Sequence, residues 1–362
     1  MIPMVDLKTQ YHNLKDEMDS ALLNVLENTQ FILGPNVQEF EKEAAAHLDA
    51  KHALSCASGT DALHLALLAA GIGPGDEVIT STFTFIATAE AIRYVGATPV
   101  FIDIDPKTFN LDPNLIEHAI NDKTKAILPV HIFGQPADMD AIMSLANKHN
   151  LLVIEDCAQS FAAKIGDQTT GGIGLAGCHS FFPSKNLGCY GDGGMVTTND
   201  DKIAEQIKIY RNHGSSKRYH HDVIGYNSRL DELQAAILRI KLKNITEYNQ
   251  GRYNAAQKYS EALKDVVIPP FEDKIGNHVY HQYTLLSPKR DSIMQKLNEA
   301  KIACAVYYPI PLHQQNVFVD DYRDISLPVS EKVAKECMSL PIFPELSDEQ
   351  INLITDTIKS VF

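Results

Sequence analysis

The most restrictive feature of the sequence is an alternation of short β-branched runs with helix-like stretches between residues 53 and 200. Runs expected to form strands lie at residues 53–56, 75–85, 98–105, 126–134 and 151–156. Helical segments are expected between them, at residues 60–71, 87–96, 113–120 and 138–150. Strands separated by such helices are typical of βαβ units, which build a mostly parallel sheet covered on both faces. The sequence therefore predicts an α/β fold.

The alternation breaks near residue 178, where the strand-like runs 178–182 and 194–200 follow each other without a full helix between them. A long helix is expected over 229–264, and the remaining chain is mixed. Further helices are expected at 290–301 and 330–339. A chain of 362 residues can hold two domains. We expect a large α/β domain over residues 1–245 and a smaller C-terminal α+β domain over residues 246–362.

The charge balance narrows the class of partner. Lys and Arg total 32 against 46 Asp and Glu, which gives a formal net charge of −14. Nucleic-acid binding needs a broad basic surface, so we expect no nucleic-acid partner. A small anionic molecule held by a few local basic side chains remains compatible with this charge.

The sequence also indicates a cytoplasmic protein with no membrane partner. No apolar run reaches the ~18–20 residues that a membrane-spanning helix needs, and the N-terminal residues lack a signal-like apolar core. The six cysteines are scattered without a CxxC pair, which favours free thiols in a reducing compartment.

Residues 172–177 match the spacing GxGxxG of dinucleotide-binding loops. That motif requires an apolar strand before it and a helix after it. Here the polar residues 165–170 precede it, and the strand-like residues 178–182 follow it. We therefore interpret these glycines as a tight crossing loop and expect no dinucleotide site.

Four other features are each weak alone and stronger together. Residues 58–60 are small and lie between a strand and a helix, where free backbone N–H groups bind anions. Asp156 ends a strand, and Lys185 lies among aromatic residues and glycines. Pyridoxal phosphate needs a lysine amine, a carboxylate at the pyridine nitrogen, an anion site and an aromatic ring beside it. Lys185, Asp156, residues 58–60 and either Phe83 or Phe85 supply all four.

Seven segments resemble, in order along the chain, the DegT/DnrJ/EryC1/StrS family of sugar-nucleotide aminotransferases. They are SGTDALHLAL, FTFIATAEAI, PVFIDID, PVHIFGQPADM, VIEDCAQS, SFFPSKNLGCYGDGG and GYNSRLDELQAAIL. The resemblance covers essentially the whole chain. It implies the fold type I aminotransferase architecture, pyridoxal 5'-phosphate as cofactor, and a homodimer with active sites at the subunit interface.

The resemblance also implies roles for individual residues. Lys185 would bind the cofactor covalently and carry the proton, and Asp156 would pair with the pyridine nitrogen. Gln159 would contact the face with the ring hydroxyl, and Phe85, rather than Phe83, would stack on the ring. The implied phosphate ligands are Gly59, Thr60 and Ser180, with Asn227 from the partner subunit. Related proteins that dehydrate or deoxygenate their substrate carry histidine in place of the lysine, so Lys185 favours transamination.

The substrate implied is a nucleotide-linked keto sugar, with L-glutamate as the amino donor. Basic residues that could meet its phosphates cluster in one segment: Arg211, His213, Lys217, Arg218, His220, His221 and Arg229. The segments SFFPSK, KRYHH, NSRLD and YPIPL resemble the subgroup that aminates UDP-2-acetamido-2-deoxy-3-oxo-glucuronate for bacterial surface polysaccharides. By the same resemblance Arg229, Tyr307, Tyr308 and His313 are candidate substrate contacts.

Two alternatives stay open at this stage. One is a 3-aminotransferase acting on a dTDP-3-keto-6-deoxyhexose, whose motifs overlap with those above. The other is a regulator that binds pyridoxal phosphate without catalysis. No metal ion is expected in the site.

Overall fold

A seven-stranded sheet organises the larger part of the molecule, whose structure is a computed structural model describing residues 1–362. Its strands are β1 (His52–Cys56), β2 (Glu77–Ser81), β3 (Thr98–Ile102), β4 (Thr124–Leu128), β5 (Leu152–Asp156), β8 (Ala176–Ser180) and β9 (Gly194–Thr198). Their order is β1-β9-β8-β5-β4-β2-β3. Only β9 runs antiparallel to its neighbours. The predicted α/β class with a mostly parallel sheet is confirmed.

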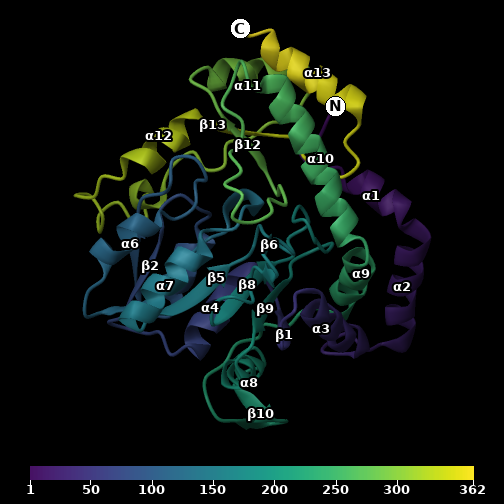
Figure 1. Ribbon diagram of the computed structural model, residues 1–362. Coiled ribbons are helices and arrows are strands. Elements are labelled where there is room, and N and C mark those ends of the chain that lie inside the picture. The colour runs from purple at the N-terminus through teal and green to yellow at the C-terminus, as the bar shows by residue number, and fades with distance from the viewer.

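Helices cover both faces of this sheet (Figure 1). They are α3 (Pro35–His47), α4 (Gly59–Ala69), α5 (Ala87–Tyr94), α6 (Pro113–Ala119), α7 (Met139–His149), α8 (Asp201–Tyr210) and α9 (Glu232–Leu242). Alternate strand residues enter different cores: Val78 belongs to a core that includes residues of α4, α5 and α8, whereas Ile79 belongs to one that includes residues of α6 and α7. This alternation is the pleat of a buried strand.

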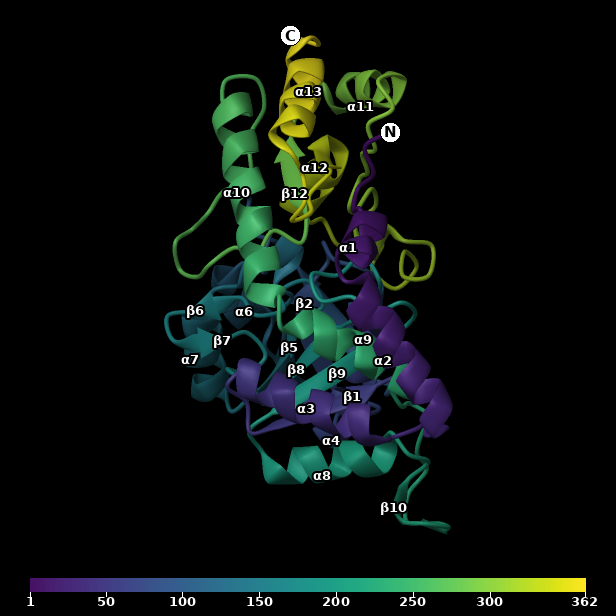
Figure 2. The ribbon, with the colours of Figure 1, turned by 90° about the vertical axis from the view of Figure 1, so that its right-hand side faces the viewer.

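A second hydrophobic core lies in the C-terminal part of the chain (Figures 1 and 2). It contains side chains of α10 (Ile245–Leu263), α11 (Arg290–Glu299), α13 (Asp348–Lys359) and the antiparallel pair β12 (Tyr283–Leu286) and β13 (Cys337–Leu340). Ile2 belongs to the same core and forms a bridge with Ile302. The division into residues 1–245 and 246–362 stays a prediction, although α10 does begin at Ile245.

The remaining elements are short or peripheral. They are α1 (Leu7–Asn13), α2 (Lys15–Asn28), α12 (Pro328–Glu336), the 3₁₀ turns η1 (Ile132–Gly134) and η2 (Leu312–Gln314), and the small pairs β6 (Lys164–Ile165) with β7 (Gln168–Thr169) and β10 (Ser215–Lys217) with β11 (His220–His221). The β10–β11 hairpin projects from the body of the molecule (Figure 2). None of the helices combines the length and apolarity needed to cross a bilayer.

The helix predicted over residues 229–264 is wrong in one respect, because the structure divides it into α9 and α10. The break lies at Asn244, whose side-chain amide donates to the carbonyl of Ile240 (3.3 Å). A side chain that occupies this carbonyl competes with the helical backbone bond that would normally use it. The predicted helix over 330–339 also ends early, because residues from Cys337 pair with β12.

Candidate active site

A cavity of about 590 Å³ lies at the carboxyl ends of the parallel strands, between the two cores. Its wall contains most of the residues that the sequence nominated, from five separate segments of the chain. These are Gly59, Thr60, Phe85, Asp156, Gln159, Ser180, Lys185, Tyr307 and Tyr308. Open α/β sheets bind ligands at this edge. The cavity is therefore the candidate active site.

Lys185 lies in the loop that joins β8 to the antiparallel β9. Two hydrogen bonds shape this loop: the Lys185 amide donates to the carbonyl of Phe182 and that of Cys189 donates to the carbonyl of Phe181, both at 2.8 Å. Burial lowers the pKa of the Lys185 amine to about 8, against the opposing effect of the Asp156 charge. A lysine with a lowered pKa is partly uncharged near neutral pH, as an amine that attacks a carbonyl must be.

Asp156 is the last residue of β5 and is 5% exposed. Its two oxygens accept different donors: the N–H of Ala158 (3.1 Å) and the hydroxyl of Thr88 (2.8 Å). Burial raises the pKa of Asp156, while both hydrogen bonds and the charge of Lys185 act in the opposite direction. The structure thus places a fixed carboxylate and an amine in one cavity.

The start of α4 forms the third part of the wall. Ser58 caps the helix by accepting the N–H of Asp61 (3.1 Å), which leaves the earlier amides of Gly59 and Thr60 for a ligand. A Cβ on Gly59 would lie 2.6 Å from the Cβ of Ser180, so a side chain does not fit there. Backbone amides at a helix start, next to a serine hydroxyl, form a site for a phosphate.

The structure separates the two candidate phenylalanines. Phe85 lines the cavity and is 55% exposed, whereas Phe83 is 1% exposed and packs against Phe109 and Phe133. The ring of Tyr308 lies 6.1 Å from that of Phe85, and its hydroxyl accepts the Gln159 amide (3.0 Å). Phe85 is thus the ring placed where a planar ligand could stack.

Three predicted residues do not line the cavity of their own chain. Asn227 is exposed and pairs with Asn212 through a backbone bridge. Arg229 donates to the Asn212 side chain (3.0 Å). His313 is 2% exposed, and its Nδ1 lies 2.8 Å from the hydroxyl of Thr82. Their roles stay predictions, and for Asn227 the predicted site is that of the partner subunit.

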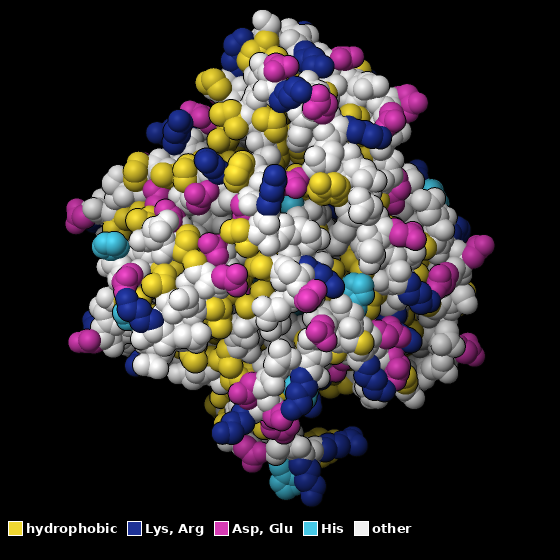
Figure 3. All heavy atoms as spheres, viewed as in Figure 1, with side chains coloured by type: hydrophobic (Ala, Val, Ile, Leu, Met, Phe, Trp, Pro, Cys, Tyr) yellow, Lys and Arg dark blue, Asp and Glu magenta, His cyan; other side chains and the backbone are white.

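The basic segment is also divided. Arg211 is 8% exposed, and its guanidinium donates to Glu41 and to the carbonyl of Ser55, so its expected place in a phosphate-binding cluster is wrong. The half-buried carboxylate of Glu41 explains its position, because a guanidinium taken out of water requires such partners. Lys217, Arg218, His220 and His221 lie exposed on the projecting hairpin, where Figure 3 shows basic and histidine side chains at the tip.

The GxGxxG segment does surround an anion, but the anion belongs to the protein itself. The carboxylate of Glu155 accepts the backbone N–H groups of Gly171 (2.8 Å), Ile173 (3.0 Å) and Gly174 (2.7 Å). Burial alone would raise the pKa of Glu155, but the hydrogen bonds from His131, Gly171 and Gly174 lower it. This loop therefore has a structural role, as the sequence context indicated.

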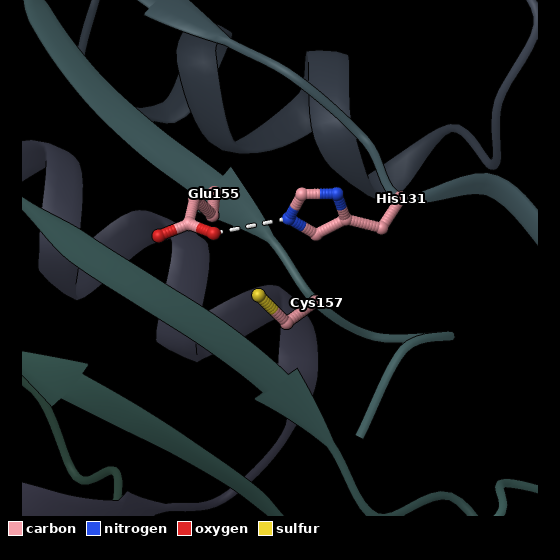
Figure 4. Close-up of side chains that lie close together, drawn as sticks. All are labelled: His131, Glu155 and Cys157. Carbon is pink, nitrogen blue, oxygen red and sulfur yellow. Dashed lines mark hydrogen bonds and ion pairs between the residues drawn. The ribbon is translucent and has the colours of Figure 1, made fainter. Parts of the chain in front are cut away.

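Glu155 also belongs to a buried group with His131 and Cys157 (Figure 4), whose polar atoms lie within 4.8 Å of one another. His131 Nδ1 accepts the N–H of Ala137 (2.9 Å), so Nε2 carries the proton that it shares with Glu155 (3.1 Å). Metal ligation requires a free lone pair on each group. Neither nitrogen of His131 has a free lone pair, because Nδ1 accepts a hydrogen bond and Nε2 carries the proton. The Glu155 carboxylate already accepts four donors. The group is therefore a poor metal site.

Further polar residues of the cavity were not nominated by the sequence: Thr84, Ser184, Asp192, His281 and Gln282. Thr84 belongs to a quoted motif, FTFIATAEAI, and its spacing of four from Thr88 was an available signal. His281 and Gln282 come from the C-terminal core, and no local pattern distinguishes them. His281 is 4% exposed and its Nδ1 has no hydrogen-bond partner.

The residues of the cavity fit pyridoxal phosphate. The amine of Lys185, the buried carboxylate of Asp156, the amides at the start of α4 and the exposed ring of Phe85 match its aldehyde, pyridine nitrogen, phosphate and ring face. The close approach of Gly59 to Ser180 is the observation that supports the phosphate end.

Comparisons with known proteins agree with this assignment. The profile of the DegT/DnrJ/EryC1/StrS aminotransferase family matches residues 12–359. The UDP-N-acetyl-3-dehydro-alpha-D-glucosamine 3-aminotransferase of Acidithiobacillus ferrooxidans is 51% identical, over 99% of this chain and 97% of that protein. The UDP-2-acetamido-2-deoxy-3-oxo-D-glucuronate aminotransferase of Pseudomonas aeruginosa is 48% identical, over 98% of each. A pleiotropic regulatory protein of Geobacillus stearothermophilus is 50% identical, over 100% of this chain and 98% of that protein.

Solved structures show the same fold. DesV of S. venezuelae, in complex with a ketimine intermediate, has a TM-score of 0.97 at 40% identity, covering 99% of this chain and 98% of that one. The NtdA protein of Bacillus subtilis, with bound PMP, has a TM-score of 0.91 at 32% identity, covering 96% of this chain and 82% of that one. Aminotransferases of this family depend on pyridoxal phosphate, the group that the cavity fits. The chain belongs to the DegT/DnrJ/EryC1/StrS aminotransferase family.

Proposed function

We propose that this enzyme transfers an amino group from L-glutamate to C3 of UDP-2-acetamido-2-deoxy-3-oxo-glucuronate, and that it does so as a homodimer with shared active sites. The observation that carries the proposal is the single cavity in which Lys185, Asp156 and the start of α4 meet. A lysine in that position can both bind an aldehyde and move a proton.

Each residue has a distinct task in this proposal. Pyridoxal phosphate, when bound, supplies an electron sink for the carbon next to the reacting nitrogen. Lys185 Nζ takes the proton from the α-carbon of the donor and later returns one to C3 of the sugar. Asp156 keeps a proton on the ring nitrogen, and Gly59, Thr60 and Ser180 hold the phosphate. Phe85 and Gln159 fix the plane in which these transfers occur, which is how positioning lowers the barrier.

Relatives support the choice of sugar. Two proteins named for UDP-linked 3-keto sugars are 51% and 48% identical to this chain, whereas a dTDP-3-amino-3,4,6-trideoxy-alpha-D-glucose transaminase of Streptomyces venezuelae is 40% identical. These identities favour a UDP sugar over the dTDP-3-keto-6-deoxyhexose that the sequence left open.

The charge of the cavity supports the homodimer. Lys185 is the only Lys or Arg in the wall of one chain, and Asp192 adds an acidic group. A sugar nucleotide carries two phosphates, and guanidinium groups bind such anions well. Arg229 and the basic hairpin residues lie outside their own cavity, so they are available to a second copy. We propose that the partner supplies these cations together with Asn227.

The scarcity of basic side chains in the cavity of one chain also favours one alternative substrate. The 51% identical relative is named for a glucosamine derivative, which lacks the C6 carboxylate of the glucuronate. The cavity of one chain offers no Arg for that carboxylate. UDP-N-acetyl-3-dehydro-glucosamine is therefore the second candidate.

The experiment supplies purified holoenzyme and glutamate with each of three keto sugars: the UDP-glucuronate derivative, the UDP-glucosamine derivative and a dTDP-3-keto-6-deoxyhexose. We expect the first to be aminated with the highest kcat/KM, measured by mass spectrometry of the product. A higher kcat/KM for either of the others would replace the proposed substrate.

A catalytically silent regulator remains the alternative of a different class, and the relative named a pleiotropic regulatory protein is 50% identical. Against it, every cofactor position holds a residue competent for catalysis. Glutamate alone should bleach the absorption of lysine-bound pyridoxal phosphate if the protein is an enzyme. An unchanged spectrum with cofactor bound would favour the regulator.

For the enzyme we propose a place in the cytoplasm, where it would supply amino sugars for lipopolysaccharide O-antigen.

A further inference from the structure

Two threonine hydroxyls, that of Thr88 in α5 and that of Thr84 in the loop before α5, form a hydrogen-bonded chain that ends on Asp156. The Thr88 hydroxyl donates to Asp156 Oδ2 (2.8 Å), and the Thr84 hydroxyl lies 3.2 Å from that of Thr88. A hydroxyl has one hydrogen, and Thr88 uses it on the carboxylate, so Thr84 must donate to Thr88. The chain runs from the cavity wall at Thr84 to the carboxylate.

The geometry fixes the carboxylate on both sides. Thr88 has no exposed surface, and its bond to Oδ2 is matched by the bond from the Ala158 N–H to Oδ1 (3.1 Å). With one donor on each oxygen, the plane of the carboxylate cannot turn without breaking a buried hydrogen bond. The remaining lone pairs are left for a group in the cavity.

We propose that Thr88 is a positioning residue, whose hydroxyl holds the Asp156 carboxylate ionised and oriented so that it keeps the ring nitrogen of the cofactor protonated. This inference rests on the pairing of Asp156 with that nitrogen, proposed above. No step of the reaction passes through Thr88 itself.

The physical argument concerns where one proton lies. A donor to a carboxylate favours its charged form, and a charge-assisted bond is stronger than a neutral one. The ionisable groups that face Asp156 are Lys185, His131, Tyr308, Cys157 and Cys178. None of these is changed by replacing Thr88. Loss of the hydroxyl should therefore move the shared proton from the ring toward the carboxylate, by about tenfold in the ratio of the two forms.

The test uses holoenzyme reconstituted with pyridoxal phosphate that is isotope-labelled at the ring nitrogen. The chemical shift of that nitrogen reports its protonation directly. We expect a protonated value in the wild type, a shift toward the unprotonated value in Thr88→Val, and the wild-type value in Thr88→Ser, which keeps the hydroxyl. Thr80→Val is the matched control, because the buried Thr80 hydroxyl donates to the Leu128 carbonyl (2.8 Å) and does not touch Asp156.

Each outcome bears on one claim. An unprotonated nitrogen in the wild type would overturn the role of Asp156 and with it this inference. If the ring nitrogen is protonated in the wild type and its chemical shift is unchanged in Thr88→Val, the role of Thr88 alone is overturned. The same holds if Thr80→Val changes the chemical shift as much as Thr88→Val does. Should Thr88→Val fail to fold, Thr88→Ala and Thr88→Ser form a second pair that differ only in the hydroxyl. Equal nitrogen shifts in that pair would overturn the proposal too.

Discussion

Two buried lysines have nearly the same proton affinity but different surroundings. Burial lowers the pKa of both Lys185 and Lys241 to about 8. Lys241 donates to the carbonyl of Gly188 (2.8 Å) and lies 4.2 Å from the ring centre of Tyr190, away from the cavity wall. A lowered pKa alone thus does not identify the reactive amine. The reactive amine is identified by the position of Lys185 in the same cavity as Asp156.

This contrast gives the first prediction. Borohydride reduction of the holoenzyme should attach the cofactor to Lys185 and leave Lys241 unlabelled, as peptide mapping by mass spectrometry would show. Lys185→Ala should lose about 10²–10⁴-fold in kcat, because the proton carrier is gone. Label on Lys241, or normal turnover in the variant, would contradict the assignment.

The second prediction concerns pH. Because burial favours the uncharged amine, half of Lys185 is uncharged near pH 8 instead of near the usual value of 10.5. The rate at which apoprotein captures pyridoxal phosphate should therefore rise with pH up to about 8 and then level off, in stopped-flow absorbance. Nα-acetyl-lysine is the control, since its rate should continue to rise well above that pH. A protein profile that matches acetyl-lysine would mean that the amine is not desolvated.

At the residue scale, the sequence could identify those functional side chains that are flanked by distinctive neighbouring residues. Lys185 and Asp156 fall in motifs with distinctive residues on both sides. Thr88 looked like any helix residue, because its importance comes from Asp156, which is 68 positions away. Arg211 shows the opposite error. It lies in a basic segment of the sequence, yet its guanidinium is buried in an ion pair with Glu41.

Among the elements, the loop of residues 171–174 shows how a buried acid can shape a turn. Glu155 lies on β5 next to Asp156, so the loop is fastened to the strand that carries the proposed partner of the ring nitrogen. Three backbone donors and one histidine satisfy a charge that would otherwise be costly to bury.

The third prediction tests this loop. Glu155→Ala should lower the free energy of unfolding by about 3 kcal/mol, because the buried N–H of Gly171 and the half-buried N–H groups of Ile173 and Gly174 lose their acceptor. Urea denaturation of the holoenzyme measures the change, and a chelator should have no effect on the wild type. Glu77→Gln is the control, since Glu77 is partly exposed and accepts a single donor, the Asn121 amide (2.7 Å). Destabilisation by the chelator would instead favour a metal at His131, Glu155 and Cys157.

The fourth prediction concerns the contact between α4 and β8. Gly59→Ala places a Cβ 2.6 Å from that of Ser180, so the helix start must move and unfolding should become easier by about 1–3 kcal/mol. Cofactor affinity, measured by fluorescence titration, should fall by about tenfold or more. In the control Gly73→Ala, the nearest atom would be the Val95 carbonyl oxygen at 3.9 Å, and affinity should be unchanged.

Element boundaries were less predictable than element types. The strand expected over residues 126–134 ends at Leu128, and the helix expected over 229–264 breaks at Asn244. Periodicity reports which residues are apolar, whereas the stops depend on tertiary contacts and on single side-chain bonds such as that from Asn244 to Ile240.

The whole molecule places its cavity between two cores and its basic hairpin outside both. The side of the cavity formed by the seven-stranded sheet carries Lys185 and Asp156, and the C-terminal part of the chain contributes His281, Gln282, Tyr307 and Tyr308. The sequence predicted that two parts exist. It could not predict that residues 281–282 would lie beside a loop near residue 185, because that contact is made only by the packing of the two parts.

The fifth prediction tests the shared site. Lys185→Ala and Asn227→Ala subunits should each be inactive alone. When they are mixed and allowed to exchange, about a quarter of wild-type activity should return, since half of the dimers are mixed and each has one intact site. Absence of recovery despite exchange, followed by mass spectrometry of the intact dimers, would show that Asn227 acts within its own subunit.

The bridge between Ile2 and Ile302 has a consequence for how the molecule can be divided. Ile2 fills part of the C-terminal core, together with residues such as Tyr259 and Leu340. A fragment of residues 246–362 expressed by itself would therefore lack part of its hydrophobic core. The apolar side chains exposed there would promote association with other apolar segments. A tether that restores residues 1–6 to such a fragment would be the simplest repair.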